Sequence, residues 1–395
     1  GFDHERSYIS SLKKGVAPFH EEGMAKLIQH PNFEPCLITN VSKLKACDLF
    51  IFCVGTPLTS TYHVDYSQLF SALSSVVKAP LNGKFVILRS TVPPLTLTER
   101  VIPFLEEKTG LKAGADFGAA SCPERVLEGH AIEEIINLPE IIGGIDQECT
   151  EIATALFKKI NPKKIITKTT SVSAELAKLY ANMYRYVNFA LANEFALLAE
   201  QFRQDATEII HAANNGYPRG GIPKPGLVGG PCLVKDGYFL LSNTAFPDFV
   251  MLASRLNEFI PQHVVNRLRI KLMEKGRFLH ASKVGLLGLA FKGGSDDERD
   301  SPSLKILELL RSENVVVTSH DPYIKGTASL KKAVHEADAI IIATNHPVFT
   351  GIEKKIFDLR GKKGDCIVLD CWSMLDTLTM EKCGFDYIKF GSRKK

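Results

Sequence analysis

The sequence lacks the patterns that would point to a metalloenzyme, a secreted protein or a membrane protein. It has no Cys-x-x-Cys pair, no His-Glu-x-x-His motif and no other cluster of metal ligands, so we expect no bound metal. Its nine cysteines are scattered, which is typical of reduced thiols rather than of a disulfide framework. No apolar run reaches the length of a membrane span, and no signal-peptide pattern is present. We therefore expect a cytoplasmic protein that binds no membrane.

An excess of charge of one sign is also missing. The formal net charge is only +4 over 395 residues, which gives no argument for nucleic-acid binding, although local Lys and Arg could meet an anionic substrate. No Gly-x-Ser-x-Gly elbow is present. The Gly-x-Gly-x-x-Gly fingerprint is absent too, and Gly285-Leu-Leu-Gly288 is only a fragment of it. The length and the 45% hydrophobic content suit a soluble globular protein of two or three domains.

Apolar runs alternate with helical patterns along most of the chain. Strands are expected at 49–54, 84–91, 116–120, 140–144, 283–292, 314–318, 339–343 and 366–369, and residues 1–3 are expected to be the end of a further strand. Helices are expected at 6–14, 66–78, 171–201, 205–213 and 302–311, with further helices up to about residue 275. This alternation predicts an α/β fold with two Rossmann-like, doubly wound parallel-sheet domains joined by a long central helix. Ligands bind such sheets beyond the carboxyl ends of the strands, where Thr56, Thr91 and Glu124 fall, although each alone could be a cap or turn residue.

The longest helical pattern covers Ser171 to Gln201, and Ser173, with Glu175 nearby, is expected to cap its start. A helix of about thirty residues spans about 45 Å, enough to link two domains and to form the core of an oligomer. Lys178 and Asn182 lie four residues apart and share one face, although polar residues on such a face are usually just solvated. The chain is expected to divide into a Rossmann-like domain at 1–168, a central helical domain at 169–276 and a second Rossmann-like domain at 277–395.

The stretch 216–236 places glycines and prolines around one cysteine, Cys232. Glycine lets the backbone approach a ligand closely, and proline restricts the path of the chain. A helix that begins after Cys232 would lower the pKa of this thiol through its N–H groups and dipole. On this stretch alone, a buried and inert cysteine in a turn before a helix is an equally good interpretation. The basic tail 391–395 is predicted to be disordered.

Six motifs follow one another at a spacing that is far more specific than any of them alone. They are Val54-Gly-Thr-Pro57, Arg89-Ser-Thr-Val-Pro93, Cys122-Pro-Glu-Arg-Val-Leu-Glu-Gly129, Glu175-Leu-Ala-Lys-Leu-Tyr-Ala-Asn182, Gly229-Gly-Pro-Cys-Leu-Val-Lys-Asp236, and Phe291-Lys292 with Arg299-Asp-Ser-Pro302. Over nearly the whole chain, this series resembles the nucleotide-sugar 6-dehydrogenase family, which includes UDP-glucose and UDP-N-acetylhexosamine 6-dehydrogenases.

The resemblance implies a four-electron, NAD-dependent oxidation of the C6 alcohol of UDP-ManNAc or UDP-GlcNAc to a uronic acid, for precursors of cell-surface polysaccharide. Cys232 matches the nucleophile, which would form a thiohemiacetal and then a thioester. Lys178 and Asn182 match residues that stabilise an oxyanion and position a water, and a lysine beside the thiol would favour the thiolate. Residues that help to activate water or hold the sugar match Asp236, Thr91, Glu124 and Glu128.

The resemblance also implies that 1–168 is the NAD-binding domain, 169–276 the dimerisation domain and 277–395 the UDP-sugar-binding domain, and binding residues are implied in the same way. The NAD-contacting positions match Asp3, Gly55, Thr56, Thr91, Glu128, Lys235 and Arg299. The UDP-sugar-contacting positions match Glu124, Arg125, Lys178, Asn182, Arg219, Gly226, Gly229 and Lys292. The helix 171–201 resembles the dimer core of the family, and Arg219 matches an arginine delivered from the neighbouring subunit, which suits an anionic diphosphate. The implied assembly is a homodimer.

The sequence departs from the family pattern in three respects. The first strand and the glycine turn that cradles the pyrophosphate do not precede Asp3, so we expect a weakened NAD site in the chain as read. Pro231 and Val234 flank the cysteine where many members carry other residues. Tyr8 stands where an arginine often follows the ribose-binding aspartate.

Three alternatives stay open at this point. The substrate could be UDP-glucose, although Cys122–Val126 and Asp296–Pro302 look closer to the N-acetylhexosamine branch. A two-electron hydroxyacid dehydrogenase of the 6-phosphogluconate type would need the lysine and asparagine but not Cys232. A dimeric scaffold that binds UDP-sugar but not NAD is the third alternative, and inspection does not separate the mannosamine and glucosamine epimers.

Overall fold

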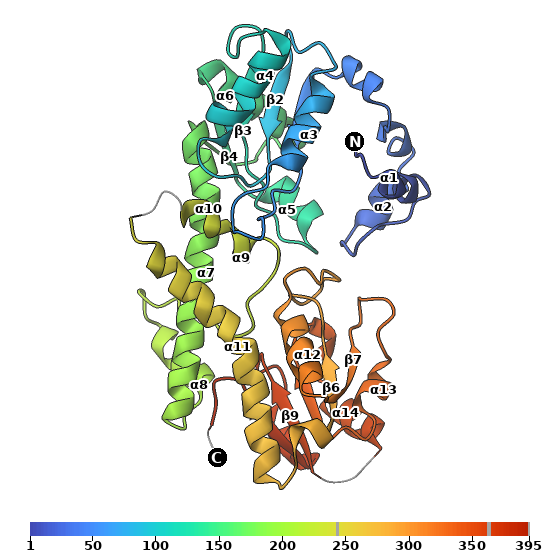
Figure 1. Ribbon diagram of the computed structural model, residues 1–395, viewed down its shortest axis with the longest axis vertical. Coiled ribbons are helices and arrows are strands. Elements are labelled where there is room, and N and C mark those ends of the chain that lie inside the picture. Colours follow the sequence, from blue (N-terminus) through green and yellow to red (C-terminus); the bar gives the residue numbers. More distant parts are fainter. Residues whose placement is uncertain (242–244, 362–364, 394–395) are drawn as a thin grey trace. The chain divides into compact units, whose positions relative to one another are not determined.

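The computed structural model describes residues 1–241, 245–361 and 365–393, which belong to two compact units (Figure 1). The first unit contains residues 1–182 and 235–244, and the second contains residues 183–234 and 245–395. Helix α7 (Ser171–Gln201) begins in the first unit and ends in the second. The three-domain division at 1–168, 169–276 and 277–395 differs from these units and stays a prediction.

The first unit is organised around a five-stranded sheet in the order β1-β2-β3-β4-β5. Its strands are β1 (Leu49–Phe52), β2 (Phe85–Leu88), β3 (Gly118–Ser121), β4 (Glu140–Gly144) and β5 (Ile166–Thr170). All neighbours pair in parallel except β3 and β4, which are antiparallel and meet only at their carboxyl ends. The purely parallel sheet expected for this domain is therefore wrong at that one pair. Glycine is needed in β4, since a Cβ at Gly143 would lie 2.2 Å from the carbonyl oxygen of Thr170.

The first unit also contains helices and short turns (Figure 1). They are α1 (Arg6–Lys13), α2 (Met24–Ile28), η1 (Glu34–Cys36), η2 (Val41–Ala46), α3 (Ser67–Val76), η3 (Leu97–Val101), α4 (Ile102–Thr109), α5 (Ala131–Asn137), α6 (Gln147–Ile160) and α10 (Tyr238–Leu241). Of these, α3, α4 and α6 lie beside the sheet (Figure 1). The short helix α9 (Leu233–Asp236) spans the boundary between the units. The apolar run of strand β2 is continuous because both faces of this strand are buried. Val86 packs in a core with residues of α3 and α4, and Ile87 packs on the other face with residues of α6.

The second unit holds another five-stranded sheet, in the order β10-β9-β8-β6-β7, and all its pairs are parallel. Its strands are β6 (Lys283–Leu287), β7 (Val316–His320), β8 (Ala339–Ile342), β9 (Cys366–Asp370) and β10 (Phe385–Lys389). The chain order reverses at β6, which pairs with β7 on one side and with β8 on the other. In doubly wound sheets this reversal opens a crevice at the carboxyl ends of the strands, where ligands bind.

The second sheet also buries both of its faces. Its helices and turns are α8 (Ala206–Asn214), α11 (Pro247–Glu274), η4 (Leu279–Ala281), α12 (Pro302–Ser312), α13 (Leu330–Val334), η5 (Pro347–Phe349), α14 (Glu353–Arg360) and α15 (Thr377–Lys382). Leu286 packs in a core with residues of α11 and α12, whereas Leu287 packs in a core with residues of α13 and α14. The successive side chains of β6 therefore point to opposite faces, as the strand geometry requires.

The start of α7 and the end of the chain differ from what the sequence suggested. The hydroxyl of Thr170 accepts the backbone N–H of Ser173 at 3.1 Å, so Thr170 rather than Ser173 supplies the cap. The prediction that the tail is disordered is wrong for Gly391 and Ser392. The backbone N–H of Gly391 donates to Glu200 at 2.9 Å, and Arg267 donates to the carbonyl of Ser392 at 3.0 Å. The last two residues lie outside the described part.

Three features are missing from the described part of the chain. Within residues 1–241, 245–361 and 365–393, no helix is long and apolar enough to cross a membrane. The same residues contain no group of three or more His, Cys, Asp or Glu side chains that could hold a metal ion. All nine cysteines are described, and none of them forms a disulfide.

Candidate functional site

A polar cluster lies at the carboxyl ends of β1 and β2 in the first unit. The hydroxyl of Thr56 is buried and donates to the carbonyl oxygen of Thr91 at 2.6 Å. The ammonium of Lys235 lies 3.5 Å from the Thr56 hydroxyl and 3.2 Å from a carboxylate oxygen of Asp236. Four candidate site residues from three distant segments of the chain thus lie together, at the edge of the sheet where ligands bind.

Asp236 is the most buried member of this cluster, with a relative exposure of 0%. The side-chain amide of Asn182, on α7, donates to Asp236 at 2.6 Å. An asparagine amide has two donor hydrogens and a carbonyl acceptor, so this bond fixes the side chain and leaves further hydrogen-bonding capacity for a ligand or water. Lys178 lies one turn earlier on α7 and is half-buried, so both side chains are on the same helix face, as the spacing predicted.

Glu124 follows β3 and is held as a carboxylate by Arg89. The guanidinium of Arg89 donates to it through two nitrogens, one of them at 3.0 Å, and the backbone N–H groups of Arg125 and Val126 donate at 2.7 and 3.1 Å. Burial alone would raise the pKa of Glu124, but the charge of Arg89 and these hydrogen bonds lower it below its ordinary value. Glu124 is therefore suited to accept hydrogen bonds from sugar hydroxyls.

Arg89 was not selected as a site residue, although it opens one of the motifs. It is only 8% exposed, and besides Glu124 it pairs with the buried Glu140 at 3.2 Å. Lys164 lies 3.8 Å from the second oxygen of Glu140, which completes a buried chain of alternating charges. The signal that could have identified Arg89 is an arginine inside a buried apolar strand, because a buried charge needs a partner.

The turn that carries Glu128 is fixed from a distant part of the first unit. The carboxylate of Glu21 accepts the backbone N–H groups of Gly129 and Ala131, each at 2.7 Å. Glu128 itself is half-buried. Arg125, which was predicted to touch substrate, donates its guanidinium to the carbonyl of Pro139 and so braces the same loop.

The ribose-binding candidate Asp3 lies near the amino end of the described chain. Phe2 forms an isolated parallel bridge with Ile38 instead of the strand end that the sequence suggested. The Asp3 carboxylate accepts the backbone N–H of Glu5 at 2.8 Å, and its side chain is 45% exposed. Gly55 directly precedes Thr56 and lies just beyond β1.

In the second unit, the loop before Cys232 is packed closely against the C-terminal sheet domain. A Cβ at Gly226 would lie 2.6 Å from the ring of Trp372, whose indole N–H donates to the carbonyl of Ala343 at 2.9 Å. A Cβ at Gly229 would lie 2.4 Å from the ring of Pro302. These two glycines are thus required by protein packing, whatever ligand they also approach.

The last glycine before the cysteine shows the same constraint. Gly230 has a φ of +95°, and a Cβ there would lie 2.6 Å from the ring of Phe291. Its N–H donates to the carbonyl of Asp300 at 3.1 Å. Cys232 is exposed and is followed at once by α9, so the helix start expected after it is confirmed.

The substrate candidate Lys292 and the cofactor candidate Arg299 lie on or beside the segment that packs on the cysteine loop. Lys292 is half-buried and follows Phe291 directly. The guanidinium of Arg299 pairs with the carboxylate of Asp297 at 2.5 Å, and its side chain is 67% exposed. Arg219, the remaining basic candidate, is exposed on the loop after α8, where it donates to the hydroxyl of Tyr217 at 2.9 Å.

The sequence related Glu175 only to the cap of α7, but its buried carboxylate has a different role in the structure. Glu175, on α7, is 2% exposed and accepts the backbone N–H of Leu97 at 3.0 Å, at the start of η3. Its second oxygen has no hydrogen-bond partner among the described residues. Burial raises the pKa of Glu175 to about 7, although the backbone hydrogen bonds oppose the shift.

Comparison with known proteins now gives this geometry a family. Residues 1–161 match the model of the NAD-binding domain of the UDP-glucose/GDP-mannose dehydrogenase family. Residues 172–258 match the central domain of that family, and residues 285–377 match its UDP-binding domain. Of the cluster at β1 and β2, Thr56 and Thr91 lie in the first match and Lys235 and Asp236 lie in the central match, whereas Lys292 lies in the last.

Individual relatives agree with the domain matches. The chain is 40% identical to UDP-N-acetyl-D-mannosamine dehydrogenase from Pyrococcus horikoshii over 89% of this chain and 84% of the relative. It is 29% identical to UDP-N-acetyl-D-glucosamine 6-dehydrogenase from Pseudomonas aeruginosa, over 89% and 83% of the two chains. A solved structure of the Pyrococcus horikoshii UDP-D-ManNAc dehydrogenase superimposes with a TM-score of 0.91 and 36% identity, covering 100% of this chain and 94% of that one. The chain therefore belongs to the UDP-glucose/GDP-mannose dehydrogenase family, whose first domain binds NAD and whose last domain binds UDP.

Proposed function

We propose that this protein oxidises the C6 alcohol of a UDP-N-acetylhexosamine to a carboxylate in two successive steps with NAD. The observation that carries the proposal is the 40% identity to a relative named UDP-N-acetyl-D-mannosamine dehydrogenase, over most of both chains. UDP-ManNAc is accordingly the first candidate substrate, and the relative from Pseudomonas aeruginosa makes UDP-GlcNAc the second. UDP-glucose remains the runner-up, since the family includes enzymes for it.

The residues at the edge of the first sheet fit NAD. Lys235 and Thr56 supply an ammonium and a hydroxyl at the carboxyl ends of β1 and β2, and Asp3 supplies a carboxylate that suits ribose hydroxyls. Gly55, Thr91 and Glu128 of the same unit complete the set that would hold the cofactor, and Arg299, in the second unit, is a cofactor candidate on the family resemblance alone. When bound, NAD accepts a hydride in each oxidation.

Cys232 acts as the nucleophile in the second half of the reaction. Its thiolate sulfur adds to the carbon of the aldehyde left by the first oxidation, and the carbonyl oxygen takes up a proton, giving a thiohemiacetal. Oxidation of this adduct leaves a thioester. Water then adds to the thioester carbon, the C–S bond breaks, and the products are the carboxylate and the free cysteine. The exposure of Cys232 directly before α9 supports this role.

The polar residues of the first unit supply charge and orientation. The ammonium of Lys178 stabilises the oxyanion that develops on the substrate. Asn182, fixed by its 2.6 Å bond to Asp236, positions the water, and Asp236 with Thr91 and Glu128 helps to activate it. Glu124, held ionised by Arg89, accepts hydrogen bonds from the sugar, and Arg125 shapes the same loop.

Residues of the second unit hold the nucleotide. Lys292 neutralises the diphosphate of the UDP-sugar. The backbone at Gly226 and Gly229 approaches the same ligand from the cysteine loop. The domain division at 1–168, 169–276 and 277–395 is part of this proposal, with the NAD site in the first segment and the UDP site in the last.

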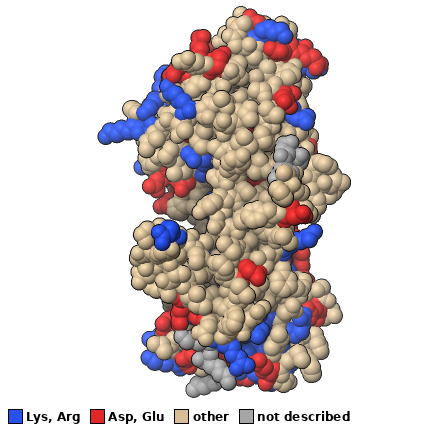
Figure 2. All heavy atoms as spheres, turned by 90° about the vertical axis from the view of Figure 1, so that its left-hand side faces the viewer, with Lys and Arg blue, Asp and Glu red and all other residues tan. Residues whose placement is uncertain are grey.

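The working form is a homodimer in which Arg219 reaches the partner's substrate. In the second unit, α8 and the turn just beyond the end of α7 expose apolar side chains, among them Phe202 at 74% and Ile209 at 48%. These line an apolar cavity of about 420 Å³ with Leu198 and Ile222. The face drawn in Figure 2 has wide areas without charged side chains, which is typical of a surface that another subunit covers.

The proposed site of action is the cytoplasm, where the absence of disulfides among the nine described cysteines is expected. The proposed product is a precursor of cell-surface polysaccharide.

The stoichiometry of NADH formation tests the reaction. With UDP-ManNAc, UDP-GlcNAc and UDP-glucose offered separately at limiting amount, a four-electron enzyme forms two NADH for each UDP-sugar consumed. One NADH would indicate a two-electron dehydrogenase that does not use Cys232, and none with any sugar would indicate a UDP-sugar-binding scaffold. Turnover of UDP-glucose alone would favour the alternative that the protein is a UDP-glucose 6-dehydrogenase.

A further inference from the structure

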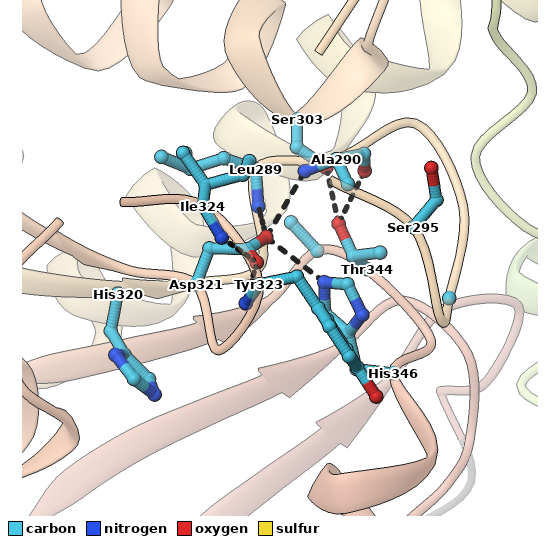
Figure 3. A network of polar contacts seen from close by, with 12 residues as sticks. Leu289, Ala290, Ser295, Ser303, His320, Asp321, Tyr323, Ile324, Thr344 and His346 are labelled. Carbon is cyan, nitrogen blue, oxygen red and sulfur yellow. Dashed lines mark hydrogen bonds and ion pairs between the residues drawn. The ribbon is translucent and has the colours of Figure 1, made fainter. Parts of the chain in front are cut away.

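A network of buried polar groups surrounds the segment that precedes and follows Lys292. It lies at the carboxyl ends of β6, β7 and β8, where the strand order of the second sheet reverses (Figure 3). Its two central side chains, Asp321 after β7 and His346 after β8, are both completely buried and lie 2.9 Å apart. Neither was selected from the sequence, and the reaction proposed above does not use them.

Asp321 binds the start of the turn after β6 and also the turn after its own strand, β7. One carboxylate oxygen accepts the backbone N–H groups of Leu289 and Ala290 at 2.7 and 3.1 Å, as well as the Nε2 hydrogen of His346. The other oxygen accepts the backbone N–H of Tyr323 at 2.9 Å. Burial would raise the pKa of Asp321, but these donors lower it to about 2, so the carboxylate stays charged.

His346 and its neighbour Asn345 bind the residues on the other side of Lys292. The Nδ1 atom of His346 accepts the backbone N–H of Gly294 at 3.2 Å, so the ring proton is on Nε2, which donates to Asp321. The side-chain oxygen of Asn345 accepts the backbone N–H of Gly293 at 2.8 Å. The backbone is therefore anchored at four positions, 289, 290, 293 and 294, that bracket Lys292.

The segment is also packed too closely to move aside. A Cβ at Gly293 would lie 2.1 Å from the carbonyl oxygen of Asn345, and one at Gly288 would lie 2.4 Å from Thr344. The hydroxyl of Thr344 donates to the carbonyl of Ala290 at 2.7 Å. Close packing and satisfied hydrogen bonds together give this stretch one backbone conformation.

We propose that the Asp321–His346 pair, with Asn345, is a positioning unit that fixes Lys292 for the diphosphate of the nucleotide. The three side chains act only through the backbone of residues 289–294. Pre-organising a cation in this way spares the protein the loss of backbone freedom on binding, which otherwise weakens affinity. The inference rests on the assignment of Lys292 in the proposed function.

The test measures UDP affinity by titration calorimetry on the full chain. His346→Asn keeps a polar group near Gly294 but loses the bond to Asp321, and Asn345→Ala removes only the acceptor for Gly293. Both variants are combined with Lys292→Ala in double-mutant cycles. His320→Asn is the matched control, since His320 lies in the same region and bonds to the carbonyl of Ala328 instead of the segment.

We expect Lys292→Ala to weaken UDP binding by about tenfold or more, which is the value of one charge-assisted hydrogen bond. His346→Asn and Asn345→Ala should each weaken it several-fold, but should change it less than twofold when Lys292 is already alanine. If His346→Asn does not fold, the Asn345→Ala variant tests the inference alone, since Asn345 is only half-buried. Wild-type affinity in both variants, or effects that add to that of Lys292→Ala, would overturn the inference. Wild-type affinity in Lys292→Ala would instead show that the proposed function misplaces the diphosphate, and the inference would fail with it.

Discussion

Replacing Glu175 by glutamine should change how the stability of the protein depends on pH. Glu175 is 2% exposed, and burial raises its pKa from the ordinary 4.5 to about 7. In the unfolded chain the group is in water and titrates near 4.5. Between these two values the folded protein keeps a proton that the unfolded chain has lost. The free energy of unfolding therefore falls as the pH rises through this window and is level above it.

The size of the effect follows from the shift. A difference of about 2.5 pKa units is worth about 3 kcal/mol, and roughly 2–3 kcal/mol of it is lost between pH 5 and pH 8. Glutamine is neutral at every pH and can still accept the backbone N–H of Leu97 through its carbonyl oxygen. Any fixed cost of burying its second polar group is the same at both pH values and cancels from the difference.

Urea unfolding at pH 5 and pH 8, followed by circular dichroism, measures this difference. The stability of Glu175→Gln relative to wild type should improve by about 2–3 kcal/mol between pH 5 and pH 8. Glu107→Gln removes the same charge from a side chain that is 71% exposed, and serves as the control. A relative stability of Glu175→Gln that does not change with pH would refute the argument, because it would mean that Glu175 has the same pKa in both states.

Three further substitutions test other parts of the molecule. Cys232→Ser should reduce acid formation by on the order of 10³-fold or more, because an alkoxide is much harder to form than a thiolate; near-normal acid formation would remove Cys232 from the mechanism. Gly230→Ala should lower the free energy of unfolding by roughly 1–3 kcal/mol more than Gly276→Ala, since both have positive φ but only Gly230 faces a ring at 2.6 Å; equal losses in chemical denaturation would contradict this packing. Phe202→Glu should weaken dimerisation by about thirtyfold or more in sedimentation, whereas the exposed Phe278→Glu should not; a wild-type dimer in the first variant would place the interface elsewhere.

Local periodicity was enough to predict most of the elements. Helix α7 has the predicted bounds, and so does β4, because a long 3.6-residue period and a short apolar run between turn residues are both signals within one segment. Strand β7 was predicted to end two residues too early, at Thr318, since its last residues are polar and are held by pairing with β6. The antiparallel meeting of β3 and β4 could not be predicted, because strand direction depends on how the connection folds back.

The candidate site was predicted only where a residue belongs to a motif. Thr56, Thr91, Lys235 and Asp236 were selected in this way, and the structure brings them together. Their assignment to cofactor and substrate stays a prediction.

The partners of the residues that support the site could not be found from the sequence. Arg89 and Glu124 are 35 residues apart, and Glu175 is 78 residues from the N–H that it accepts. Asp321 follows β7 and His346 follows β8, and these two strands come to lie on either side of β6 only when the sheet forms. Pairing of this kind depends on the three-dimensional arrangement, for which one sequence carries no local signal.

The packing of Trp372 on the cysteine loop gives the protein an optical reporter of its own. Trp372 is the only tryptophan in the chain, so the long-wavelength fluorescence of the whole protein originates at one indole. That indole covers Gly226 and donates to Ala343, and it therefore senses the loop and the end of β8 at the same time. Lifting the loop would let water reach the ring and shift its emission to the red, without any label and without global unfolding. The emission of Trp372 can thus show whether the loop moves during a titration with UDP or a UDP-sugar. Recorded through denaturation beside circular dichroism, it can also show whether the loop opens before the rest of the chain unfolds.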